Sequence, residues 1–275
     1  MRYELRPLGV GGVLDQSIAL FKDRLGLFVT ILLILRIPTT AVMQYAVLSN
    51  MAQMPLSATD AQMNEFFGRM MRLYFFVLAP WLLFYVFVVA PLSDAALIYA
   101  TGRSYLGQSV TLRESLRAAL RRYFPMLWTS ILFYLIYVFG LLFCFLPGIL
   151  LFAYFALSTT IAVLEPTSGV GALGRCRDLM RSIFSTNYVN IFLLLTALVV
   201  FQWFMGATSG FIPQIHLQVL ASAVLGSISY SFFIVAQVVY YYSCRCRIEG
   251  FDLLQLARVV AETPVDQPPA LERQG

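Results

Sequence analysis

Charged residues are scarce in this sequence. Asp, Glu, Lys and Arg make up 12% of the 275 residues, about half of the usual ~25% in a soluble domain. Apolar residues make up 60% of the chain. Because so much apolar surface cannot be hidden inside one water-soluble fold, the composition excludes a soluble enzyme, a disordered chain and a secreted disulfide-rich domain. It predicts a polytopic membrane protein.

Histidine is nearly absent, which limits the chemistry available to the chain. His216 is the single histidine, and the sequence has no glycine-rich phosphate loop and no cluster of metal-ligand residue types. The four cysteines are Cys144, Cys176, Cys244 and Cys246. They do not have the spacing of a zinc site. We therefore expect no enzymatic activity, no cofactor and no metal.

Six apolar runs have lengths near the roughly 20 residues that a helix needs to cross a bilayer. They cover Leu27–Leu48, Leu73–Tyr99, Met126–Phe145, Ile149–Leu164, Val189–Met205 and Val219–Tyr242. The sequence predicts an all-α fold: one six-helix transmembrane domain over residues 1–262, followed by a disordered polar tail over 263–275. The fourth run is at the lower edge of the spanning length.

Basic residues concentrate on one side of these six runs. Sixteen of the 19 Lys and Arg residues fall on the side of both termini, and only Arg69 and Arg72 fall on the other. The positive-inside rule then places both termini in the cytoplasm. This distribution makes the anionic lipid headgroups of the cytoplasmic face the expected partners, and it argues against nucleic acid despite the net charge of +5.

Short amphipathic segments precede the odd-numbered runs. They cover Val10–Leu25, Val110–Tyr123 and Gly171–Phe184, and each has apolar residues at helical spacing with Arg or Lys on the other face. Such helices are typical of the membrane interface. The pattern favours three repeated units, each an interfacial helix followed by a membrane hairpin. The alternative is that any loop leading into a span tends to be amphipathic and basic.

The connection over residues 49–72 is the only long one on the side opposite the termini. It contains Met51, Met54, Met63 and Met70, with no nearby His or Cys. Copper binding is one interpretation of these methionines. Their irregular spacing instead favours an apolar cap folded over the helix bundle.

Two charged residues are predicted inside the spans. Arg36 lies about nine residues into the first run, or roughly 13 Å at 1.5 Å per residue. A charge near mid-depth is costly and usually faces a partner or a wet cavity. Asp94 in the second run is the natural partner. The interpretations left open are a structural ion pair beside the Pro38 kink, a substrate or ion contact, and proton coupling through Asp94.

A further pairing is expected at the end of the fourth run. Glu165 ends that run just before Pro166. It can cap the helix or pair with Arg175 or Arg177 in the following amphipathic segment.

Three segments resemble one bacterial family. They read LRPLGVGGVLDQSIALFKDRLGLF at the start, AVLEPTSGVGALGRCRDLMRS in the middle and YYSCRCRIEGFDLLQLA after the last run. Together they resemble the six-span proteins labelled as the membrane domain of glycerophosphodiester phosphodiesterase. The resemblance covers most of the chain and implies a multi-pass protein of the bacterial inner membrane.

The last of these segments carries the most specific motif. Its residues are Tyr241, Tyr242, Arg245, Arg247, Glu249, Gly250, Phe251 and Asp252. The family usually has Asp where Ser243 stands, and Ser where Cys176 stands, so one expected partner for the motif arginines is missing. As an anchor, the motif would place tyrosines in an interfacial belt and arginines at headgroup phosphates. A docking site for an unidentified protein partner is the alternative.

The family's name comes from fusions to a catalytic phosphodiesterase domain. This chain lacks the length, the histidines and the metal carboxylates for that domain. We expect a non-enzymatic membrane module that scaffolds or regulates a partner in lipid metabolism. The alternative is a transporter or flippase of a small or amphipathic solute, favoured by the charges and prolines inside the spans. A cavity that reaches Arg36 favours transport, and a dry packed bundle favours the module.

Overall fold

The computed structural model describes residues 6–51, 59–143, 145–181 and 186–253, and its regular structure there is entirely helical. This confirms the all-α prediction for those residues. The elements are α1 (Val10–Asp23), α2 (Leu25–Leu35), α3 (Ile37–Met51), α4 (Asp60–Leu73), η1 (Tyr74–Leu78), α5 (Ala79–Phe84), η2 (Tyr85–Val89), α6 (Ala90–Tyr105), α7 (Leu112–Phe143), α8 (Phe145–Phe155), α9 (Ser158–Leu164), α10 (Val170–Arg181), α11 (Thr186–Ser209) and α12 (Ile215–Glu249).

Several of these helices are long and apolar enough to cross a membrane. Four of them satisfy both conditions in the described ranges: Asp60–Tyr105, Leu112–Phe143, Val189–Ser209 and Ile215–Glu249. A fifth crossing results if the bent pair Leu25–Leu35 and Ile37–Asn50 is one span. Their length and composition indicate a multi-pass membrane protein. The six separate spans of the sequence prediction are not seen.

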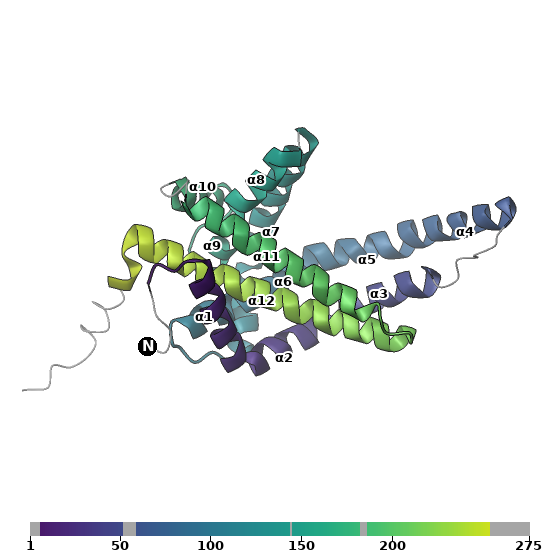
Figure 1. Cartoon of the computed structure of the whole chain (residues 1–275), viewed down its shortest axis with the longest axis horizontal. Coiled ribbons are helices and arrows are strands. Elements are labelled where there is room, and N and C mark those ends of the chain that lie inside the picture. Colours follow the sequence, from purple (N-terminus) through teal and green to yellow (C-terminus); the bar gives the residue numbers. More distant parts are fainter. Residues whose placement is uncertain (1–5, 52–58, 144, 182–185, 254–275) are drawn as a thin grey trace, which may run out of the picture.

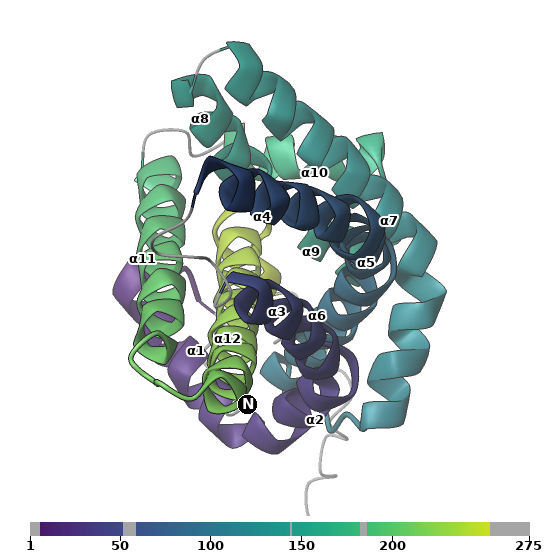
Figure 2. The same cartoon turned by 90° about the vertical axis from the view of Figure 1, so that its right-hand side faces the viewer.

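Helix α12 runs along most of the bundle, with α11 beside it (Figure 1). It also packs against α1, α3 and α6. Every residue from Ile234 to Cys244 is buried. A helix that is covered all round lies at the centre of a bundle. Helices α7 and α8 pack against each other as a hairpin, which lies to one side of α12 (Figure 2).

The first predicted span is broken at Arg36. Helices α2 and α3 meet there at 51°. Pro38, the second residue of α3, has no backbone N–H to continue the ladder of α2. The carbonyl of Arg36 accepts the backbone N–H of Thr40 at 3.0 Å, together with the hydroxyls of Thr39 at 2.8 Å and Thr40 at 2.9 Å. The expected kink is therefore present, with Arg36 at its joint.

The second predicted span contains a second kind of backbone irregularity. The π-helical turns η1 and η2 come just before Pro80 and Pro91. Pro91 cannot donate to the carbonyl of Phe87, four residues earlier. The hydroxyl of Tyr123 in α7 donates to that carbonyl instead. The freed backbone group of one helix is thus bonded by a side chain of its neighbour.

The fourth predicted span, Ile149–Leu164, forms two short helices. Helices α8 and α9 are separated at Ala156 and Leu157. Two carbonyls at the break find side-chain partners: the Cys176 thiol donates to Tyr154 at 3.3 Å, and the Gln237 amide donates to Ala156. These bonds stabilise a break that would otherwise leave polar groups exposed to an apolar interior.

The hairpin between α7 and α8 depends on two glycines. A Cβ on Gly148 would lie 2.6 Å from Leu141 Cδ2, and one on Gly140 would lie 3.0 Å from the Gly148 Cα. The two helices therefore approach more closely than side chains would allow.

The expectation of a separate interfacial helix over Val110–Tyr123 is wrong. Helix α7 continues from Leu112 to Phe143 without a break and passes through Pro125. Ser115 and Ala119 are fully buried, which keeps the segment in line with the rest of the helix, whereas Leu120 of the expected apolar stripe is 65% exposed. The helix begins with a capping box, in which Glu114 and Thr111 bond each other's backbone N–H. The other two amphipathic segments form the separate helices α1 and α10.

The expected apolar cap over the bundle is also wrong for the described part of the 49–72 connection. Helix α4 has no buried residue and projects away from the other helices (Figure 1). It belongs to a continuous helix of 46 residues, about 69 Å long at 1.5 Å per residue. Since a hydrocarbon core is only about 30 Å thick, such a helix must extend beyond it. Met54 and the tail over 263–275 lie outside the described residues.

Candidate functional site

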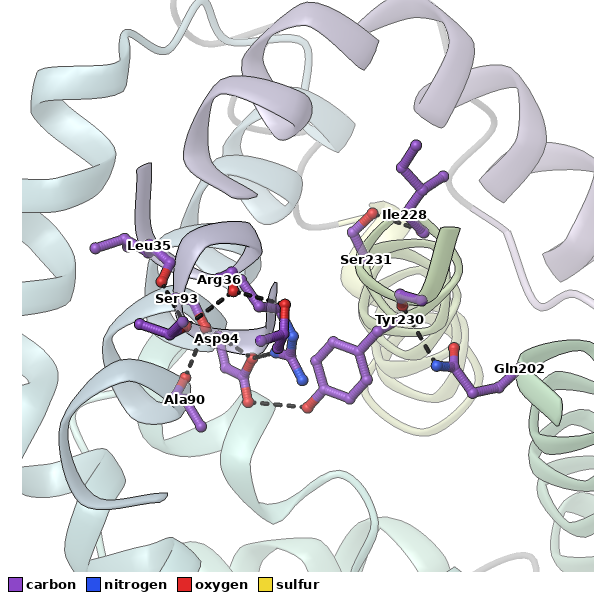
Figure 3. Close-up of polar contacts among 12 residues, drawn as sticks. Leu35, Arg36, Ala90, Ser93, Asp94, Gln202, Ile228, Tyr230 and Ser231 are labelled. Atoms are coloured by element: carbon purple, nitrogen blue, oxygen red, sulfur yellow. Dashed lines mark hydrogen bonds and ion pairs between the residues drawn. The ribbon is translucent and has the colours of Figure 1, made fainter. Parts of the chain in front are cut away.

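The structure brings Arg36 and Asp94 together. The guanidinium Nη1 lies 3.0 Å from Asp94 Oδ1, and the two side chains are only 11% and 14% exposed (Figure 3). Arg36 comes from the joint of α2 and α3, and Asp94 from the first turns of α6. The break in one helix therefore places a buried cation against the start of the other.

Tyr230 of α12 is the third member of this cluster. Its hydroxyl donates to Asp94 Oδ2 at 2.9 Å, and the Arg36 guanidinium lies 3.6 Å from the centroid of its ring. A cation held over an aromatic face is stabilised electrostatically. Both carboxylate oxygens of Asp94 are thus bonded. The sequence analysis missed Tyr230, although a tyrosine within an apolar run usually needs a partner for its hydroxyl.

A cavity of about 600 Å³ adjoins the cluster. Arg36, Asp94 and Tyr230 form part of its wall, together with residues of α7, α8, α11 and α12. Most of the remaining wall is apolar, and its other polar side chains are Tyr85, Ser130, Tyr134, Thr159, Gln202 and Gln237. A smaller cavity of about 130 Å³ also touches Arg36 and Tyr230. The charged pair is therefore accessible to a bound molecule as well as satisfied internally.

A second cluster joins Glu165 and Arg175 to the motif at the end of α12, which the sequence analysis treated separately. Arg175 Nε lies 3.2 Å from Glu165 Oε2, and Arg175 also pairs with Glu249. Glu249 in turn accepts from Arg245 Nε at 2.8 Å, while the Tyr241 hydroxyl donates to Glu165 at 2.7 Å. Helix α10 is thereby tied to the end of α9 and to the end of α12.

The motif tyrosines do not form the expected interfacial belt. Tyr240, Tyr241 and Tyr242 are between 0% and 5% exposed, because α12 is covered by its neighbours there. Tyr242 stacks on Tyr105 of α6, with ring centroids 5.4 Å apart. Their role in this structure is packing within the protein.

Helix α12 ends at Glu249, just before a glycine. Gly250 has φ +59° and forms a left-handed cap. Phe251, the next residue, lies with its ring centroid 4.3 Å from the Arg245 guanidinium carbon. Asp252 follows at an intermediate exposure.

Two arginines have partners other than those expected. Arg177 lies 3.7 Å from Asp178 on an exposed surface and does not pair with Glu165. Arg247 donates to the carbonyl of Leu8 at 3.2 Å. Ser243 bonds the backbone of Leu8.

Cys176 has the properties of a structural thiol. It is fully buried, and this burial raises the pKa of the thiol to about 12. Arg175 beside it has a pKa above its usual value, because hydrogen bonds and attraction to Glu249 and Glu165 outweigh the effect of burial. The described residues contain no group of three or more His, Cys, Asp or Glu that could hold a metal ion.

Fold and site together define a helical, multi-pass membrane protein with a charged pair beside an internal cavity. Comparisons of the chain with models of protein families, with curated proteins and with solved structures give no match.

Proposed function

We propose that this chain is a transporter or flippase of an amphipathic solute, bound in the cavity beside Arg36 and Asp94. The observation that carries the proposal is the cavity itself, which reaches the charged pair and has a volume of about 600 Å³. Small-molecule sites in proteins are typically concave, about 300–1,000 Å³, and mostly apolar with a few placed polar groups. The cavity fits that description.

The lining favours a molecule with one polar and one apolar part. The Arg36–Asp94–Tyr230 cluster offers donors and acceptors for a polar group, and the surrounding apolar wall suits a hydrocarbon chain. Two lining side chains are strongly exposed, Tyr134 at 54% and Trp203 at 77%, so the cavity is open to the surroundings. A solute could therefore enter from the lipid.

The broken helices around the cavity support movement of such a solute. In secondary transporters, discontinuous helices at mid-depth form the binding sites. Here α2 and α3 break at Arg36, and the π-helical turn η2 ends just before the helix that carries Asp94. Both irregular backbones line or adjoin the cavity.

The orientation is part of the proposal. We infer six crossings in the bacterial inner membrane, with α8 and α9 together forming the short fourth one and both termini in the cytoplasm. The asymmetry of basic residues supports this. In intact cells, with Cys144 replaced by Ser, Gln214→Cys should react with an impermeant thiol reagent and Ser109→Cys should not. The reverse pattern would contradict the orientation.

Transport can be tested with a fluorescent lipid. The protein is reconstituted into vesicles with NBD-labelled phosphatidylglycerol, and dithionite then bleaches the label in the outer leaflet. We expect bleaching to exceed the half seen in protein-free vesicles. Ser130→Phe fills the cavity and keeps the charges, so it should slow movement of the labelled lipid to the outer leaflet at least about tenfold. Arg177→Gln, on the exposed surface, should leave this rate unchanged. Bleaching equal to that of empty vesicles would contradict the proposal.

A non-enzymatic module is the second candidate. It is favoured by one observation: Arg36 and Asp94 satisfy each other and Tyr230 without a ligand. In that case the bundle is a support for a partner in lipid metabolism, as the family resemblance implies. The double variant Arg36→Met with Asp94→Leu distinguishes the two candidate functions. A purely structural pair can be replaced by apolar residues without loss of function, whereas a pair that binds the solute cannot.

A further inference from the structure

A second and larger cavity lies where α6 ends and α7 begins. Its volume is about 1030 Å³, and its walls come from α6, α7, α9 and α12. It shares no residue with the cavity beside Arg36. Nothing in the proposed transport function requires it.

The charged residues of this cavity are mostly basic. Its wall contains the arginines Arg103, Arg117, Arg121, Arg122 and Arg245 and a single carboxylate, Glu114. That carboxylate already accepts a hydrogen bond from the backbone N–H of Thr111 at 2.9 Å. The acid caps its own helix and keeps its charge, so a single negative charge stands against five arginines in the wall.

Three of the five arginines have no anionic partner among the described residues. Arg245 pairs with Glu249, and Arg103 donates to the side-chain oxygen of Gln108. No such contact is made by Arg117, Arg121 and Arg122. Arg117 and Arg121 are four residues apart on one face of α7, and Arg122 is the neighbour of Arg121. Their guanidinium groups are available to an anion that enters the cavity.

The rest of the wall combines polar and apolar side chains, the polar ones being Tyr99, Gln108, Tyr241 and Tyr242. The apolar part comes from Leu106, Val163, Leu164 and Phe251. Helix α6 comes close to α9 and α12 at Gly102, where a Cβ would lie 2.8 Å from Leu164 Cδ2 and 3.3 Å from the Tyr242 hydroxyl. The cavity thus combines a packed apolar part with arginines.

We propose that this cavity binds the phosphate group of an anionic phospholipid. Guanidinium groups form paired, charge-assisted hydrogen bonds with phosphate oxygens. Basic pockets between membrane helices on the cytoplasmic side are suited to lipid headgroups. A soluble phosphate compound offers the same anion. The apolar part of the wall favours the lipid, because it can cover the glycerol and the start of the chains.

The test is native mass spectrometry of the delipidated protein, titrated with dioctanoyl phosphatidylglycerol or dioctanoyl phosphatidylcholine. We expect phosphatidylglycerol to bind more tightly, since only it has a net negative charge. The double variant Arg117→Gln with Arg121→Gln should weaken its binding at least about tenfold. The matched control is Lys22→Gln with Arg113→Gln, which removes the same charge from the same end of the helices but not from the cavity wall. It should bind as the wild type does.

A third variant tests the cavity without changing charge. Ala118 is part of the wall, so Ala118→Phe should lower phosphatidylglycerol binding while all arginines remain. Unchanged binding in this variant, or an equal loss in the two charge-neutralising variants, would show that the lipid adheres to the basic surface and would overturn the proposal. Equal affinity for the two lipids would overturn it as well.

Inorganic phosphate distinguishes the lipid from a soluble anion. We expect 10 mM phosphate to leave bound phosphatidylglycerol in place. Complete displacement, with phosphate bound as tightly as the lipid, would overturn the assignment to a phospholipid and identify the ligand as a soluble phosphate compound.

Discussion

The hydroxyl of Ser243 bonds both backbone groups of Leu8. It accepts the Leu8 N–H at 2.8 Å and donates to the Leu8 carbonyl at 3.3 Å. Both residues are at most 5% exposed. The segment before α1 is thereby fixed to the end of α12, 235 positions later in the chain. The serine has the size and both hydrogen-bonding capacities that this contact needs, and Asp would offer only acceptors at neutral pH.

Ser243→Ala should destabilise the protein. The substitution leaves the buried N–H of Leu8 without its side-chain partner, which costs about 1–3 kcal/mol. A lower thermal midpoint in detergent would report this loss. Ser109→Ala is the control, because Ser109 is exposed, and its midpoint should match that of the wild type. A midpoint unchanged by Ser243→Ala would contradict the importance of the contact.

Arg36 and Asp94 should behave as a coupled pair. Removing either partner leaves the other charge buried, at a cost of about 3–5 kcal/mol. We expect Arg36→Ala and Asp94→Ala each to reduce folded yield in detergent, and the double variant to lose less than the sum. Tyr230→Phe, which removes one hydrogen bond and keeps the ring under Arg36, should have a smaller effect. Additive losses would mean that the two charges are not coupled.

Glu249 should contribute strongly to stability. It bonds both Arg175 and Arg245, so Glu249→Gln weakens two charge-assisted contacts, worth about 1.5–3 kcal/mol each before non-additivity. Chemical unfolding of the purified protein measures the loss. Arg177→Gln should change stability by no more than about 0.5 kcal/mol, since Arg177 is exposed. If both variants unfold alike, the cluster does not hold α10 in place.

Cys176 should resist alkylation in the folded protein. Its pKa of about 12 leaves about one thiolate in 10⁵ at pH 7, and the thiolate is the reactive form. Burial also prevents access of a reagent. Peptide mapping after N-ethylmaleimide treatment at pH 7 should find Cys176 unmodified and a cysteine introduced at Ser109 modified. Alkylation at similar rates would contradict the buried position.

The sequence predicts what depends on local pattern. The scarcity of charge identifies the membrane helices, and Pro38 predicts the kink at Arg36. Asp94 is expected to partner Arg36 because so few charges lie within the apolar runs. Tyr230 is not distinguished from other aromatic residues of its run, since its bond to Asp94 joins positions 136 apart.

Long-range contacts explain the differences between prediction and structure. Glu165 and Glu249 belong to one cluster through Arg175, although 84 residues separate them in the sequence. The break between α8 and α9 contains neither glycine nor proline, and it is stabilised by Cys176 and Gln237 from other helices. The continuity of α7 likewise depends on burial of Ser115 and Ala119 by the rest of the fold. None of these partners can be identified from the segment that it stabilises.

The bond between Gln237 and the carbonyl of Ala156 has a consequence for biosynthesis. A ribosome produces the chain from its N-terminus, so Ala156 exists before Gln237, 81 residues later. Leu8 must likewise precede Ser243. Helix α12 therefore completes the backbone hydrogen bonds of segments made earlier, and a chain that ends before Ile215 lacks both partners. These two contacts can form only when α12 has been translated and inserted.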